Sequence, residues 1–154
     1  MTLFKFSNNS MLSALEAPLQ EVFLEQWREN PAAHAGATAL VIPNDVRFSD
    51  SVDDLSGFSV IILQFPAFKD GRAYSQARIL RERLGYAGEI RARGDVLRDQ
   101  LLFMVRCGFD AFELAGEDSS DAQASLHEFS FSYQSAADNE DPVWRKRLLR
   151  ADAA

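Results

Sequence analysis

The chain has 154 residues, 47% of them hydrophobic, and a formal net charge of −7, which is typical of one soluble domain with a hydrophobic core. The negative charge disfavours nonspecific binding to nucleic acid. No apolar run approaches the roughly 18 residues of a membrane span, and the N-terminus lacks the basic and then apolar pattern of a secretion signal. We therefore expect a cytoplasmic protein that contacts neither membrane nor nucleic acid.

The first 37 residues are predicted to form an N-terminal extension. Leu3–Ser7 has the pattern of a short edge strand. Apolar residues recur at helical spacing over Leu12–Trp27, which predicts a helix there. Asn30-Pro31 should end this helical stretch, because the residue before a proline avoids the helical conformation.

Residues 38–134 are predicted to form a single α/β domain. Four strands are expected, over Thr38–Ile42, Phe58–Phe65, Glu89–Arg93 and Asp110–Leu114. Helices are expected over Gly71–Leu84 and Asp95–Arg106, with a helical turn at Ser51–Leu55. Short links between alternating strands and helices favour parallel strands joined by right-handed crossovers. The predicted fold is therefore a mostly parallel sheet built of βα units.

The pattern weakens after Leu114. A further helix is predicted at Ala122–Glu128, followed by a polar and basic C-terminal tail over residues 135–154. Within this tail, the basic segment after Pro142 carries Trp144 and Leu148, which we expect to dock on the body of the protein.

One face of the predicted sheet is polar. Side chains alternate between the two faces of a strand, so Gln64, Arg91, Arg93 and Glu113 fall together, opposite the helix-covered apolar face. Parallel strands covered on both faces are usually apolar throughout. Two arginines on one strand face therefore suggest a sheet covered on one side only, such as a partial (half) TIM-like barrel, or a polar pocket. Arg91 could form a structural ion pair with Glu113 or bind a ligand, and the sequence leaves both open.

A second group of candidate residues lies where the predicted strands end. The carboxyl ends of parallel strands meet at one edge of a sheet, where ligand sites form. Residues 69–106 hold nine Lys and Arg and five Asp and Glu, a local charge of +4 that leaves −11 on the rest of the chain. This edge is predicted to bind a phosphate, sulfate or carboxylate group, or an acidic partner. The alternative is that Asp70 only caps a helix. The residues expected at or beside this edge are Lys69, Asp70, Gly71, Arg72, Arg91, Arg93, Asp95 and Arg98.

No known catalytic pattern is present in the sequence. Neither a glycine-rich dinucleotide motif nor a phosphate-binding loop occurs, and His34 and His127 are far apart. The single Cys107 excludes an intramolecular disulfide and an all-cysteine metal site, and its apolar context predicts a buried structural thiol. We predict no cofactor and no metal, and leave the catalytic residues unassigned.

Several segments nevertheless resemble a known family. They are Phe65-Pro66, Phe68, Asp70-Gly71-Arg72, Tyr74-Ser75, Arg78, Leu80-Arg81, Gly88-Glu89-Ile90-Arg91-Ala92, Gly94-Asp95-Val96-Leu97-Arg98-Asp99-Gln100, Arg106-Cys107-Gly108-Phe109-Asp110-Ala111-Phe112 and Phe131-Ser132-Tyr133-Gln134. Together they resemble the bacterial domain of unknown function family 934. That resemblance implies an association with assimilatory sulfate and sulfite reduction, in which members are described as probable oxidoreductases. It supplies no catalytic residues.

From the residues and the resemblance together we expect an accessory protein of sulfite reduction, whose edge residues bind a small anion or dock on the reductase. An enzyme acting on a small anionic metabolite is the second hypothesis, with Asp70 or Asp95 transferring a proton. A non-enzymatic module whose polar sheet face closes against a second copy, as a homodimer, is the third.

Overall fold

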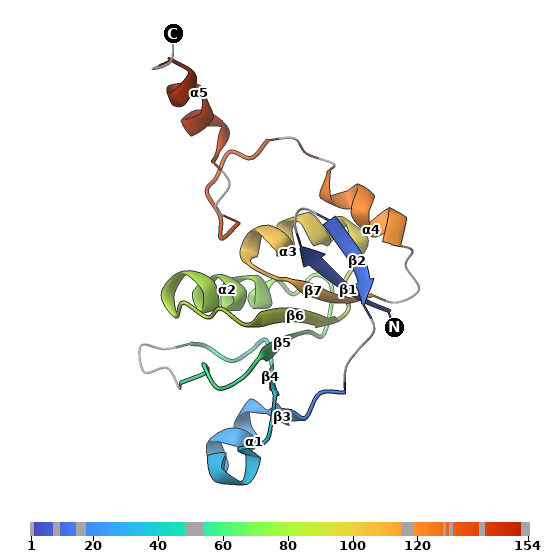
Figure 1. The fold of residues 1–154 in the computed structure, drawn as a ribbon, viewed down its shortest axis with the longest axis vertical. Coiled ribbons are helices and arrows are strands. Elements are labelled where there is room, and N and C mark those ends of the chain that lie inside the picture. Colours follow the sequence, from blue (N-terminus) through green and yellow to red (C-terminus); the bar gives the residue numbers. More distant parts are fainter. Residues whose placement is uncertain are drawn as a thin grey trace.

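A curved, mostly parallel sheet forms the centre of the molecule (Figure 1). The computed structural model describes residues 2–7, 10–14, 18–48, 54–114, 119–127, 129, 131–138 and 141–151. The strands are β1 (Thr2–Ser7), β2 (Ser10–Ala14), β3 (Glu21–Phe23), β4 (Ala39–Ile42), β5 (Val60–Phe65), β6 (Glu89–Gly94) and β7 (Ala111–Leu114). They form one sheet in the order β2-β1-β7-β6-β5-β4-β3.

The helices are short, and all except the last follow a parallel strand. They are α1 (Leu24–Glu29), α2 (Arg72–Arg78), α3 (Leu101–Cys107), α4 (Ser119–Leu126) and α5 (Val143–Ala151). A π-helical segment, Ile79–Arg83, continues α2, and 3-10 turns occur at Pro31–His34 and Arg98–Gln100. Strands β3 to β7 are parallel and adjacent in chain order, whereas the β1–β2 hairpin joins β7 antiparallel. The predicted α/β class is confirmed.

The sequential strand order explains why the main helices share one face of the sheet. Each right-handed crossover moves the chain one strand in the same direction, so its helix returns over the same side. Alternate residues such as Leu63, Ile90 and Phe112 are fully buried there against Leu80 of the π-helical segment and Leu101 of α3. This face holds the main hydrophobic core.

The opposite face is concave. Arg93 on β6 contacts Glu21 on β3, although β4 and β5 lie between these strands. Three strand spacings amount to about 14 Å, and Arg93 also lies four residues beyond Glu89, the β6 residue in register with Glu21. Side chains could not bridge that separation on a flat sheet, so curvature must bring the two strands together. A partial barrel agrees with this curvature and stays a prediction.

The predicted helix over 12–27 is wrong. In the described part of that range, β2 and β3 are strands, and the only helix is α1, which begins at Leu24. The helical spacing misled because Val22 is buried by pairing with Leu40 of β4, a contact that lies far along the chain. Asn30 ends α1 as predicted.

The N-terminal strands belong to the same sheet as the later ones. β1 was expected at an edge, but it lies between β2 and β7. The predicted domain boundaries at residues 37 and 134 remain a prediction. The helical turn expected at Ser51–Leu55 lies mostly outside the described residues.

The basic C-terminal helix does not dock as predicted. α5 extends away from the sheet and the other helices (Figure 1). Its Trp144 and Leu148 are 50% and 59% exposed. The prediction concerned a basic segment that docks. In the described structure this segment is a helix, and the body offers no cover for its apolar residues.

Candidate functional site

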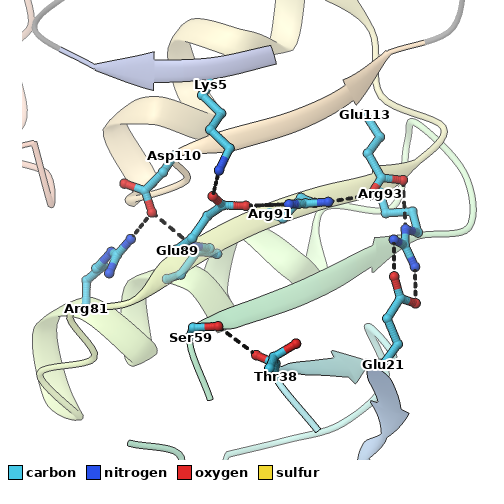
Figure 2. A network of polar contacts seen from close by, with 11 residues as sticks. Lys5, Glu21, Thr38, Ser59, Arg81, Glu89, Arg91, Arg93, Asp110 and Glu113 are labelled. Carbon is cyan, nitrogen blue, oxygen red and sulfur yellow. Dashed lines mark hydrogen bonds and ion pairs between the residues drawn. The ribbon is translucent and has the colours of Figure 1, made fainter. Parts of the chain in front are cut away.

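An alternating chain of charges crosses the concave face of the sheet (Figure 2). Going from β1 through β6 and β7 to β3, it runs Lys5, Glu89, Arg91, Glu113, Arg93 and Glu21. Three cations alternate with three carboxylates, so each internal member has an opposite charge on both sides. We call these six residues the charge network.

Arg91 is the most buried member of the network. Its side chain is 3% exposed, and its guanidinium donates to Glu89 Oε1 from Nε at 2.9 Å and from Nη2 at 2.8 Å. Its Nη1 lies 3.5 Å from Glu113 Oε1. Buried charges are tolerated only when they are paired in this way, so Arg91 is held as a structural ion-pair residue.

Arg93 sits at the end of the network nearest the carboxyl ends of the strands. Its Nε donates to Glu113 at 2.7 Å, and its two terminal nitrogens donate to the two oxygens of Glu21 at 2.8 and 2.7 Å. These hydrogen bonds lower the pKa of Glu21 and raise the pKa of Arg93. Five donors in a planar fork suit such bidentate pairing.

The network joins the polar-face residues that parity predicted. Arg91, Arg93 and Glu113 lie together as expected, with Gln64 half-buried on the same face of β5. Glu89 shares the parity of Arg91, so the sequence could have revealed it. Lys5 and Glu21 could not be found, because their places depend on which strands lie next to one another.

A second polar cluster fastens the amino-terminal ends of β6 and β7 (Figure 2). Arg81 forms an ion pair with Asp110 and donates to the carbonyls of Tyr86, Gly88 and Gly108 at 2.6, 2.8 and 3.0 Å. Asp110 also accepts the N–H of Ile90 at 2.8 Å. This arrangement satisfies loop carbonyls, which is a structural role.

The loops at the opposite ends of these strands are held together. Asp95 accepts the N–H of Phe68 at 2.9 Å, and Gln100 donates to the carbonyl of Phe68 at 2.9 Å. The helix predicted to begin at Asp95 begins later, because the Asp95 carboxylate bonds the neighbouring loop and the next helical turn starts only at Arg98.

Asp70 and Arg72 occupy each other at this edge. Arg72 donates to both oxygens of Asp70, at 2.9 and 2.7 Å, and its backbone N–H lies 3.3 Å from the same carboxylate. The hydrogen bonds from Arg72 lower the pKa of Asp70, and the amide of Asn44 adds to this effect. A carboxylate held ionised by its neighbour is poorly suited to donate a proton at neutral pH.

The two loops expose a mixed apolar and basic surface. Phe68 and Leu97 are 53% and 41% exposed. Arg72 and Arg98 are more than half exposed, and among the described residues Arg98 pairs only with a distant carboxylate, that of Asp121 at 4.0 Å. We call the surface formed by Phe68, Lys69, Arg72, Leu97 and Arg98 the edge surface.

A comparison with protein families identifies the chain. A model described as "Bacterial protein of unknown function (DUF934)" matches residues 39–144. The chain belongs to this family. No curated protein and no solved structure matches it.

The family match covers every residue of the edge surface. It also covers four of the six residues of the charge network, whereas Lys5 and Glu21 lie before its first residue. Among the described residues, no three side chains of His, Cys, Asp or Glu are grouped as a metal site would require. No helix in the described part is both long and apolar enough to cross a bilayer.

Proposed function

We propose that this family member is an accessory protein of assimilatory sulfite reduction that docks on the reductase through its edge surface. The observation that carries docking is the edge surface itself, where Phe68 and Leu97 are exposed beside basic side chains on two loops that are bonded together. Apolar anchors within a charged rim are typical of protein interfaces. The pathway is inferred from the family resemblance.

The ion pairs favour a docking role over binding of a small anion. An anion needs guanidinium donors that are free to turn toward it. Arg91 and Arg93 instead direct theirs to carboxylates, and Arg72 directs two of its donors to Asp70. The basic rim that remains is spread over exposed loops, which suits an extended acidic surface on a protein partner.

Two experiments test the proposal. The first is deletion of the gene, which we expect to abolish growth on sulfate but not on cysteine. Normal growth on sulfate would overturn the assignment to this pathway.

The second experiment is capture of the reductase from sulfate-grown cells by tagged protein. Phe68→Ser combined with Leu97→Ser should reduce capture at least tenfold, since interface anchors contribute about 1–2 kcal/mol or more each. Phe23→Ser is the matched control, because Phe23 is similarly exposed but lies on β3 and not on the two loops that form the edge surface. Equal capture by all variants would refute docking at this surface, and turnover of sulfite by the purified protein alone would favour an enzyme.

A further inference from the structure

A second exposed apolar surface lies on the helical side of the molecule. A groove of about 850 Å³ runs between α3 and the segment that follows α4. Phe103, Phe129, Phe131 and Tyr133 line it and are between 49% and 78% exposed. Exposed aromatic side chains gathered in one groove mark an interaction site more often than chance exposure does. We call this the aromatic groove.

Residues 134–138, beside the groove, are hydrogen-bonded to α3. Arg106 on α3 donates to Asp138 at 3.0 Å and to the carbonyl of Gln134 at 2.5 Å. The N–H of Ala137 in turn donates to the carbonyl of Arg106 at 2.9 Å. These three bonds hold residues 134–138 against α3, and Arg106 and Asp138 themselves line the groove.

The same chain carries an apolar helix face without cover. Trp144 and Leu148 lie four residues apart on α5 and therefore share a face, with Leu149 beside them. All three are at least half exposed. Burying them would recover several kcal/mol that the isolated helix leaves in water.

The start of α5 lies at the rim of the aromatic groove of its own copy. The N–H of Val143 donates to the carbonyl of Ser132 at 2.8 Å, and Ser132 lines the groove. Lys146 lies over the ring of Phe131 at 5.9 Å. From there the helix runs away from the body (Figure 1). In this position Trp144 and Leu148 on its apolar face are exposed and are not among the residues that line its own groove.

Charge favours a partner of the same kind as this chain. Val143–Ala151 contains four basic and no acidic side chains, which gives α5 a charge of +4. The net charge of −7 then leaves −11 on the remaining residues. A basic helix leaving an acidic body is attracted to the acidic body of a second copy.

We propose that the protein forms a symmetric dimer in which α5 of each copy lies in the aromatic groove of the other. A two-fold axis makes the contact reciprocal, so every copy gives one helix and receives one. One interaction then covers both the aromatic groove and the apolar face of α5. The edge surface is not involved, so this dimer is independent of docking to the reductase.

Sedimentation of the purified full-length chain across protein concentrations tests the dimer. Trp144→Ser combined with Leu148→Ser should weaken it roughly a hundredfold, with unchanged far-ultraviolet circular dichroism. Phe129→Ser in the groove should weaken it too, and the matched control Leu97→Ser on the edge surface should not. A higher salt concentration should also weaken the dimer. A wild-type monomer at about 100 µM, far above a typical specific Kd, would overturn the proposal. So would a dimer that ignores the α5 and groove variants.

Disulfide trapping then tests whether α5 of one chain lies in the aromatic groove of another chain. In a Cys107→Ser background, one chain carries Leu148→Cys and another carries Phe103→Cys. Oxidation of the mixture should give covalent dimers of one of each. Absence of that species, or a monomer closed on itself when both cysteines are on one chain, would overturn the exchange of helices. Monomeric protein that binds anionic vesicles through α5 would assign the helix to a lipid surface instead.

Discussion

Replacing Arg91 with methionine tests whether the charge network holds the sheet together. Met retains much of the apolar volume and removes the cation, leaving Glu89 and Glu113 at 15% and 10% exposure without their shared partner. Breaking a buried ion pair from one side costs about 3–5 kcal/mol. Each carboxylate keeps a second cation, Lys5 or Arg93, so we take the lower end and expect a loss of about 3 kcal/mol.

The assay is urea unfolding followed by circular dichroism. The matched control is Arg72→Met, which removes an equally short ion pair whose arginine is 58% exposed. Surface pairs contribute about 0.2–1 kcal/mol, so this variant should unfold near the wild-type midpoint. Added salt should erase the small effect at Arg72 and leave the large effect at Arg91.

A loss at Arg91 no larger than the loss at Arg72 would refute the reasoning, because burial would then add nothing to the pair. A double-mutant cycle sharpens the test. If Arg91 and Glu113 act as one unit, Arg91→Met with Glu113→Gln should cost less than the two single changes added together. Strict additivity would count against a coupled network.

Three further predictions concern positions outside the network. Gly94→Ala should lower the free energy of unfolding by about 3 kcal/mol or more, because Gly94 has φ +119° and an added Cβ would lie 2.2 Å from the backbone oxygen of Phe65. The control is Gly57→Ala, which should unfold like wild type because an added Cβ there has no atom within 4 Å. Burial raises the pKa of Tyr74 and Tyr86 to about 12, so the stability that these two side chains contribute should be constant below pH 10 and fall as the pH rises toward 12. Two tyrosines titrating by absorbance near 10 would contradict this. Burial also raises the pKa of the Cys107 thiol, so iodoacetamide should modify it more slowly than it modifies the urea-unfolded chain, and equal rates would disprove that protection.

The βα units were predictable from the sequence because their signals are local. β5, α2 and β6 follow one another with short links. The helix predicted to end near Arg106 ends at Gly108, which adopts a left-handed conformation. Among the N-terminal strands, β1 was predicted as a strand, whereas most of β2 and all of β3 fell in the predicted helix. β3 has only three residues, and it is a strand because β4 lies beside it.

The candidate site likewise combines residues that local sequence patterns predicted with residues whose positions depend on long-range contacts. Parity placed Arg91, Arg93 and Glu113 on one face without knowledge of the fold. Their partner Glu21 had been assigned to a helix, so the neutralisation of Arg93 could not be foreseen. The edge loops were located correctly, but the bond from Phe68 to Asp95 joins segments 27 residues apart, and no local pattern reports it.

The strand order also has a consequence for the order of folding. The first 23 residues supply β2 and β3, the outermost strands on both sides of the sheet. During synthesis they emerge first, yet β1 must wait for β7, more than 100 residues later, before its second neighbour exists. Pairing across such sequence distances is slow. Until it occurs, a nascent chain ending beyond Leu114 has the β7 margin of its parallel strands unpaired, and that margin is open to strands from other chains.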